Sequence, residues 1–276
     1  MTRLAHHRIF HHTLLAAAAI AAISIPQQLA AGGVISIPFN ASNFSNPLTI
    51  NNPLLPMVPG TVQTYKAEGP DGCEVDVFEV TNEEKTITIG GSSIQVRVIH
   101  DVGYEDPECN GTLEKHEETF DWHAQDNAGN VWYFGEDTRN CTPAGCTPGE
   151  GSWEAGVDGA KPGIIMLAHP DNGDQYYQEF YAGHAEDQAK VTGVDVTVIL
   201  KREDAWPGSP FTGCLKTKEW SRLSPGDVEQ KYYCPGIGNV AVDEHHGKEL
   251  RFELVDPEAD AAADSAFRFR TVPPRR

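Results

Sequence analysis

The chain has 276 residues, and its 40 acidic residues against 21 lysines and arginines give a formal net charge of −19 at pH 7. A surface of this sign repels nucleic acid and anionic membranes and tolerates or attracts cations, so we expect no nucleic-acid partner. An acidic exterior that keeps the protein in solution is the simplest interpretation of the charge.

Residues 1–31 have the pattern of a secretory signal peptide: Arg3 and Arg8 precede an apolar run from Thr13 to Ile25, and small residues follow. The run is about thirteen residues, shorter than the roughly 20 that span a bilayer. Cleavage removes two arginines and no acid, which changes the net charge from −19 to −21. We expect a secreted or periplasmic protein without a membrane span. A retained N-terminal anchor is the alternative, and the absence of a cysteine after the run argues against a lipid anchor.

Residues 32–60 are rich in proline and asparagine and predict an extended arm. Residues 61–256 alternate β-branched or aromatic residues with polar ones, as strands with one face on a core do. The segments with this alternation are 61–65, 73–80, 85–89, 94–99, 113–124, 131–134, 174–181, 189–200, 214–220, 231–234, 238–242 and 249–254. Only 182–188 and 257–267 could form short helices, and 257–276 predicts a flexible tail. We therefore expect a single all-β domain, an antiparallel meander forming a curved half-barrel or barrel.

An even number of cysteines in an exported chain indicates disulfides, and six cysteines allow fifteen connectivities. No pair has the C-x-x-C spacing of a zinc or redox motif. Cys141 and Cys146 enclose a small loop, which favours a disulfide between them. Cys73 and Cys109 lie on consecutive predicted strands, as do Cys214 and Cys234, which favours these two further pairs.

The densest group of acids, aromatics and histidines lies between 121 and 187. Asp121, His123 and Gln125 project to one face of a predicted strand, where they could hydrogen-bond a polar ligand or bind a metal. A solvated face opposite a core tryptophan explains them equally well. The candidate ligand-binding residues of the whole region are Asp121, His123, Gln125, Trp132, Glu136, Asp137, Trp153, Glu154, Glu179 and His184.

Two further interpretations concern the acids. Carboxylates in glycine-bearing turns such as 135–137 and 158–159 could supply oxygens to Ca²⁺, although no EF-hand spacing is present. Aromatic residues beside acids, as in 176–187, are typical of sugar-binding surfaces. They are equally typical of a barrel core that contains polar side chains among the aromatic ones. We expect no cofactor, with Ca²⁺ as the open alternative.

The chain resembles a family of exported bacterial proteins of unassigned function. The phrases that carry the likeness are DWHAQD (121–126), GNVWYFGEDT (129–138), GSWEAGVDGA (151–160), AED (185–187) and KYYCPGIG (231–238). The likeness covers about residues 44–255. The family pattern has Tyr more often than His at 123, which weakens a catalytic or metal role for His123, and Ala in place of Cys234, which makes the Cys214–Cys234 pair a local addition. A weaker similarity to periplasmic lipoprotein-carrier-like half-barrels implies a fold with a concave face.

No nucleophile elbow, zincin helix, P-loop or dinucleotide fingerprint is present. The first hypothesis for function is an exported soluble binding protein that holds a small ligand or glycan in a concave β-sheet site, without turnover. The alternative is an extracellular carbohydrate-active hydrolase or lyase that uses paired carboxylates among Asp121, Glu136, Asp137 and Glu154, with His123 or His184 as base.

Overall fold

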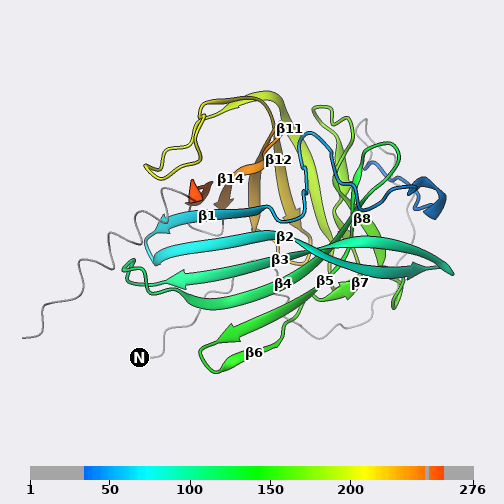
Figure 1. The fold of residues 1–276 in the computed structure, drawn as a ribbon, viewed down its shortest axis with the longest axis horizontal. Coiled ribbons are helices and arrows are strands. Elements are labelled where there is room, and N and C mark those ends of the chain that lie inside the picture. Colours follow the sequence, from blue (N-terminus) through cyan, green and yellow to red (C-terminus); the bar gives the residue numbers. More distant parts are fainter. Residues whose placement is uncertain (1–33, 246–248, 258–276) are drawn as a thin grey trace, which may run out of the picture.

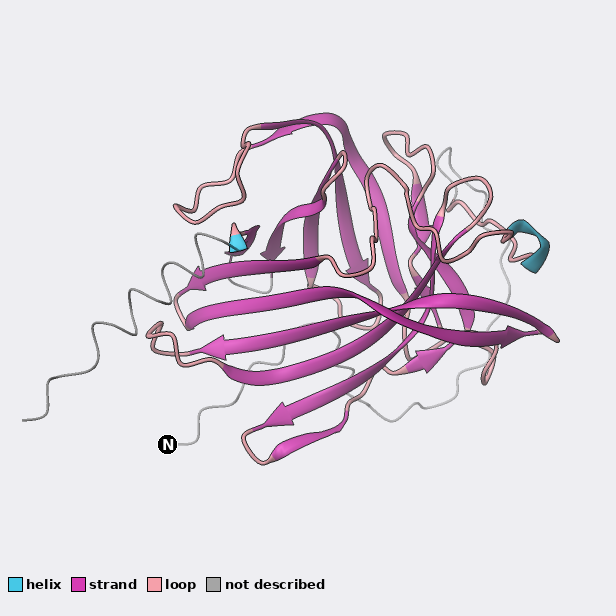
Figure 2. Ribbon diagram, viewed as in Figure 1, coloured by secondary structure: helices cyan, strands magenta, loops and turns pink. Residues whose placement is uncertain are grey.

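A computed structural model describes residues 34–245 and 249–257. The predicted signal peptide and all but the first residue of the predicted tail lie outside these residues. Almost every described element is a strand (Figure 2). The elements are η1 (Ala41–Asn43), β1 (Val62–Gly69), β2 (Gly72–Ile89), β3 (Ser92–Asp106), β4 (Glu114–Gln125), β5 (Val131–Thr142), β6 (Gly145–Pro148), β7 (Trp153–Glu154), β8 (Lys161–Met166), β9 (Gln175–Tyr177), β10 (Glu179–Phe180), β11 (Asp187–Val198), β12 (Phe211–Ser221), β13 (Val228–Cys234), β14 (Gly238–His245) and β15 (Glu249–Leu254).

The strands form one antiparallel sheet that curls into a barrel (Figure 1). Its order is β10-β8-β5-β4-β3-β2-β1-β15-β14-β13-β12-β11-β9, with β6 and β7 paired to β5. Sequential strands are therefore neighbours over most of the sheet, as in a meander, and the predicted all-β antiparallel fold is confirmed. No helix in the described part of the chain is long and apolar enough to cross a membrane.

The two edges of the sheet meet in one short segment. β9 pairs with β11 and β10 pairs with β8, although only Gln178 separates β9 from β10. The N–H of Gln178 donates to the carbonyl of Asp187 at 2.8 Å. The predicted strand 174–181 is thus split between two partners, and this split closes the barrel. The possible helix at 182–188 is not formed, because 182–184 make a turn between Tyr181 and Ala185 and β11 begins at Asp187.

The arm is the first described part of the chain; it begins at residue 34, passes through η1 and leads to the start of β1 (blue in Figure 1). The rings of Phe39 and Phe44 pack edge-on against Trp132 and Phe134 of β5, with centroid distances of 5.7 to 6.2 Å. Aromatic pairs of this geometry stabilise by about 0.5–1.5 kcal/mol beyond their buried area. The arm therefore belongs to the main hydrophobic core and covers the outer face of β5.

Three disulfides are formed, Cys73–Cys109, Cys141–Cys146 and Cys214–Cys234, which are the pairs that proximity favours. The second joins the paired strands β5 and β6, and the third joins β12 and the end of β13. Disulfides form and persist in oxidising compartments, so the protein is secreted or periplasmic.

Candidate ligand-binding cavity

The barrel encloses a cavity of about 330 Å³. Its wall is built by inward-facing residues of most strands of the sheet, and it combines aromatic and aliphatic side chains with many acids. Eleven acidic residues line it, namely Asp76, Asp101, Glu117, Asp121, Glu136, Glu179, Asp187, Glu219, Asp227, Glu229 and Glu244. Lys231 is the single lysine or arginine among the described residues that line it. Much of the acidity of the chain is therefore inside the barrel and not only on its exterior.

The arm closes one end of this cavity. Leu55 and Met57 line the cavity, and the carbonyl of Pro53 accepts the N–H of Gly236 in the turn after β13. The opposite end of β13 begins at Val228, next to the turn 222–227 that carries the exposed Asp227. The cavity thus runs from an apolar cap under the arm toward a polar end at this turn.

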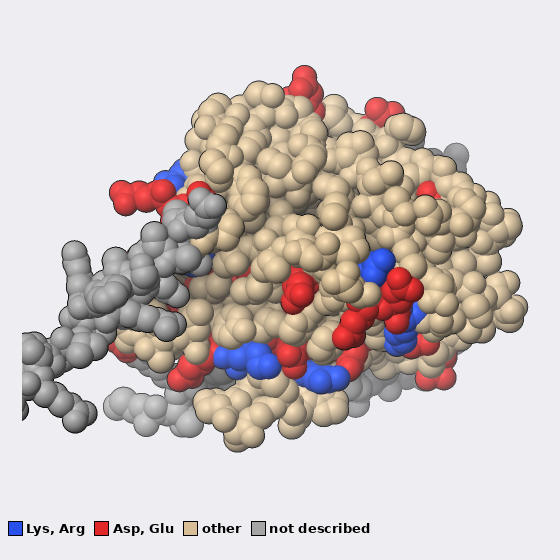
Figure 3. Space-filling view, in the orientation of Figure 1, with Lys and Arg blue, Asp and Glu red and all other residues tan. Residues whose placement is uncertain are grey.

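On the exterior, the face shown in Figure 3 carries charged side chains of both signs in a band across its lower half, with a larger uncharged area above. Within this band acids lie beside lysines and arginines, whereas acids at the upper edge of the face stand apart from them (Figure 3). Inside the barrel, by contrast, acids face one another with a single lysine among them.

A bulge in β5 brings three of the functional groups together. Asp121 pairs with Glu136 and His123 pairs with Tyr133, so one residue of β4 between these pairs lies opposite two residues of β5. Gly135 adopts a φ of 130°, and a Cβ at this position would lie 2.1 Å from the carbonyl oxygen of Trp153. Only glycine fits this close approach. Because of the bulge, Tyr133 and Glu136 both face the cavity although they are three residues apart.

The hydroxyl of Tyr133 lies between the two carboxyl groups, 2.5 Å from Asp121 Oδ1 and 2.9 Å from Glu136 Oε2. A phenol has one hydrogen to donate, so one of these contacts requires a proton on the carboxyl group. Burial, followed by the charge of Asp121, raises the pKa of Glu136 well above its ordinary value. Burial raises the pKa of Asp121 to about 6, opposed by the hydrogen bond from Tyr133. We therefore assign the proton to Glu136, which donates to Tyr133, while Tyr133 donates to the ionised Asp121.

The wall formed by β12 and β13 holds a second pair of acids in a different way. Glu219 and Glu229 are directly opposite each other in the register, and Lys231 Nζ lies 3.1 Å from Glu219 and 3.2 Å from Glu229. Thr217 and Tyr233 also donate to Glu219, at 2.7 and 3.2 Å. Burial by itself raises the pKa of Glu219, but Lys231 and these donors lower it below its ordinary value. Here an ammonium, and not a shared proton, stabilises the pair.

Six cavity acids have raised pKa values and form no ion pair within the described residues. We call them the acidic track, and they are Asp101, Glu117, Asp121, Glu136, Glu179 and Asp187. Burial is the first cause in every case. It raises the pKa of Glu117 to about 8, assisted by the charges of Asp76 and Asp121, and that of Asp187 to about 7. The Oδ1 atom of Asp187 is buried without a hydrogen-bond partner.

Four of the predicted ligand-binding residues lie together in the cavity: Asp121, His123, Glu136 and Glu179. His123 is buried, stacks on Tyr133 with a centroid distance of 4.6 Å, and donates from Nδ1 to the carbonyl of Trp132 at 3.3 Å. Burial lowers the pKa of His123 to about 4, so its ring is neutral near pH 7. The structure therefore supports His123 as a neutral polar group in the wall.

The other six lie elsewhere. Gln125 accepts the N–H groups of Asn51 and Asn52 at 2.9 and 2.8 Å and so holds the arm. Trp132 and Trp153 are buried in the main core. Asp137 pairs with Arg139 at 2.8 Å, Glu154 pairs with Lys85 at 2.7 Å, and His184 stacks on Tyr181 in a turn. None of these six is among the residues that line the cavity.

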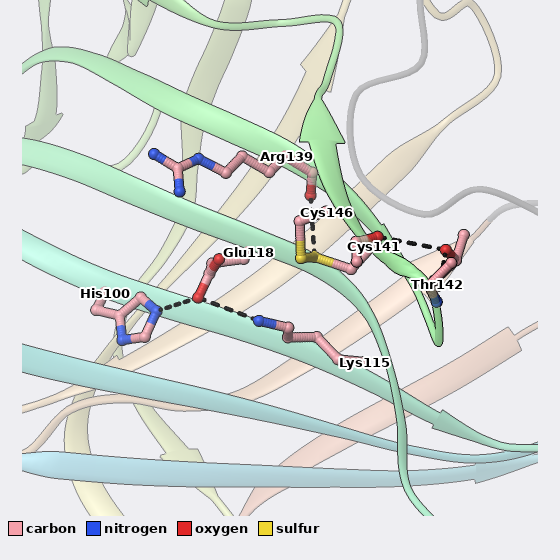
Figure 4. The surroundings of a disulfide bond; sticks show 9 residues. His100, Lys115, Glu118, Arg139, Cys141, Thr142 and Cys146 are labelled. Atoms are coloured by element: carbon pink, nitrogen blue, oxygen red, sulfur yellow. Dashed lines mark hydrogen bonds and ion pairs between the residues drawn. A yellow bond between two sulfur atoms is a disulfide. The ribbon is translucent and has the colours of Figure 1, made fainter.

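Within residues 34–245 and 249–257, one group of metal-ligating atoms lies within 4.8 Å of one another: Glu118, Cys141 and Cys146. The two sulfur atoms form a disulfide, and Glu118 already accepts from His100 at 3.0 Å and Lys115 at 3.2 Å (Figure 4). Disulfide sulfurs are not thiolates, so this group does not hold a metal. The described acids of the glycine-bearing turns do not converge in the way that a Ca²⁺ site requires.

Several cavity residues were not expected from the sequence, chiefly Tyr133, Asp187, Glu219 and Lys231. The alternation of Glu229, Lys231 and Tyr233 along one strand face is a usable signal, since a lysine on an inward face needs a carboxylate partner. For Asp187 there was no such signal, because its position depends on the closure of the barrel.

No protein-family description matches the chain, and no curated protein matches it in sequence. Among solved structures, one similar chain is a Bacteroides fragilis NCTC 9343 protein provisionally described as exported and as having a YmcC-like fold. It has 12% sequence identity, 73% of this chain and 96% of that chain are covered, and the TM-score is 0.34. Another is a Parabacteroides distasonis ATCC 8503 protein provisionally described as a lipoprotein, with 13% identity, the same coverage of 73% and 96%, and a TM-score of 0.31. At these TM-scores neither likeness carries an inference about this chain.

Proposed function

We propose that the protein is an exported soluble binding protein that holds a small ligand inside the barrel, without turnover. The observation that carries the proposal is the cavity of about 330 Å³, which lies in the lower part of the range of volumes that small-molecule sites occupy. A barrel filled by its own side chains would have argued against any ligand.

The chemistry of the wall narrows the type of ligand. Trp132 and Trp153, the two tryptophans among the predicted ligand-binding residues, are in the packed core, and Trp220 is the tryptophan that lines the cavity in the described part of the chain. A wall with eleven acids is also poorly suited to a purely apolar lipid, because burying carboxyl groups against hydrocarbon costs free energy. These two features favour a small polar ligand over a glycan or a lipid.

The test is a thermal-shift screen of the oxidised chain against small polar molecules, soluble glycans and short lipids. A ligand that binds the native state alone raises Tm by mass action, so a dose-dependent shift is expected from at least one polar compound. Hits are then incubated with the protein and followed by mass spectrometry, where no product should form. The absence of a shift from every class, together with no uptake of a neutral fluorescent probe, would refute the proposal.

A hydrolase or lyase is the second candidate, because Tyr133 links one protonated and one ionised carboxyl group, Glu136 and Asp121. A neutral acid beside a carboxylate is the arrangement that glycoside cleavage needs. Release of reducing sugar from any glycan, abolished in Glu136→Gln and retained in Glu154→Gln, would favour this candidate over simple binding.

A further inference from the structure

We propose that the ligand of the barrel is a linear organic cation with two or more ammonium groups separated by methylene chains, bound along the acidic track. This inference rests on the proposed binding function and specifies its ligand class.

The wall already shows how it holds an ammonium. Glu219 and Glu229 are a directly opposed pair of acids, and the ammonium of Lys231 lies within 3.2 Å of both. Asp121 and Glu136 are also directly opposed, but in the part of the chain that the structure describes no lysine or arginine forms an ion pair with either. A proton shared through Tyr133 takes the place of the ammonium. Within the acidic track, the pair Asp121 and Glu136 thus repeats the register of Glu219 and Glu229 without the cation.

A second observation comes from Asp187. Its side chain is 7% exposed and lines the cavity, and its Oδ1 atom accepts no hydrogen bond. A buried carboxylate oxygen without a donor costs free energy, and such atoms are rare in native structures unless something binds them. Burial, followed by the charge of Asp187, raises the pKa of Glu179, the next acid of the track, because a nearby carboxylate disfavours a second negative charge. A donor with a positive charge satisfies both groups.

The length of the track favours more than one charge. Glu117 and Asp121 lie on the same face of β4, four residues apart, so their Cα atoms are about 13 Å from each other. One ammonium at either end leaves the other end unpaired. Two ammonium groups joined by a flexible chain can reach both.

The same wall offers apolar contacts for the chain between the charges. Phe78, Ile165, Val242 and Phe252 line the cavity together with the acids. Methylene groups that pack on these side chains are removed from water while the charged ends reach the carboxylates. A metal ion does not fit as well, because no three acids of the described cavity wall bring ligand oxygens within 4.8 Å of one another.

The experiment is isothermal titration calorimetry of the oxidised chain with spermidine, at neutral pH and physiological ionic strength. Butylamine, with one ammonium, and CaCl₂, a divalent ion without a chain, are the matched probes. We expect spermidine to bind at least about tenfold more tightly than either, a difference of about 1.4 kcal/mol. Equal or tighter binding of Ca²⁺ would overturn the inference in favour of a metal.

Variants distinguish the cavity from the acidic exterior. Glu179→Gln and Asp187→Asn, on two different strands, should each weaken spermidine binding by about tenfold. Glu154→Gln and Asp137→Asn are the matched controls, because both acids are partly exposed outside the cavity and paired with a base. Circular dichroism checks that each variant folds. If one cavity variant does not fold, the other still tests the inference. Weakening by the controls, or none by the cavity variants, would show adsorption to the surface and refute the inference.

A neutral fluorescent probe, N-phenyl-1-naphthylamine, separates this inference from the proposed function. If the probe binds and spermidine displaces it, the result supports both the binding function and the cationic ligand. Binding of the probe without displacement, and no calorimetric signal from spermidine, leaves the binding function standing and overturns the cationic ligand. Binding of neither molecule overturns both.

Discussion

Replacing Lys231 by methionine tests the electrostatics of the cavity wall most directly. The substitution keeps the length of the side chain and removes the ammonium that lies 3.1 Å from Glu219 and 3.2 Å from Glu229. The side chain of Glu219 is 7% exposed, so its charge stays buried without its main partner. Breaking a buried pair in this way costs about 3–5 kcal/mol.

We expect a value near the lower limit, because 27% of the Lys231 side chain is accessible and Thr217 and Tyr233 still donate to Glu219. A loss of about 3 kcal/mol lowers Tm by roughly 6–12 °C in a domain of this size. Urea unfolding followed by tryptophan fluorescence measures the loss. Lys190→Met, at an exposed position of β11, is the control and should leave the midpoint unchanged.

The pH dependence separates charge from packing. Without the ammonium, burial raises the pKa of Glu219, and at pH 5 the folded variant can protonate it. The stability difference between Lys231→Met and the parent should therefore be smaller at pH 5 than at pH 8. A native-like variant that loses less than about 1 kcal/mol, or the same loss at both pH values, would refute the assignment of Lys231 as the essential counter-ion of Glu219.

Tyr133→Phe removes the hydroxyl between two carboxyl groups and should destabilise the protein by about 2 kcal/mol in urea unfolding; no change would mean that the shared proton is not structural. The stability of the ligand-free protein should rise by about 3 kcal/mol as pH falls from 8 to 6, because the folded state binds more protons than the unfolded state where the pKa of Glu117 is about 8 and that of Asp187 about 7. The rise should continue below pH 6 until these acids also protonate in the unfolded state, near their ordinary values of 3.8 and 4.5, and His123 opposes it in part because its folded pKa is lowered to about 4; a stability that climbs steadily from pH 6 to 8 would contradict the raised values. Asn52→Ala removes the donors to the carbonyls of Gly129 and Leu167, at 2.9 and 3.1 Å, and should cost about 2 kcal/mol and speed proteolysis of the arm; an arm that stays protected would show that its aromatic contacts suffice.

Part of the candidate site was predictable from local pattern. Asp121 and His123 follow the period-two rule along β4, and they do face the same side of the sheet. The rule fails in β5, where Tyr133 and Glu136 face the cavity three residues apart because Gly135 forms a bulge. It also fails at Gln178 and Glu179, which are adjacent in sequence and both line the cavity because the chain changes partner strands there.

The all-β class, the antiparallel order of neighbouring strands and the export of a disulfide-bonded chain could be predicted from the sequence, since they depend on local alternation, short turns and residue composition. Tertiary structure alone decided which acids face inward. The closure of the barrel at 175–180 and the bulge at Gly135 set the facing of Glu179, Asp187 and Glu136. The pKa of each carboxyl group then follows from its burial and from acids on other strands, interactions that depend on distance in space and have no counterpart in sequence spacing.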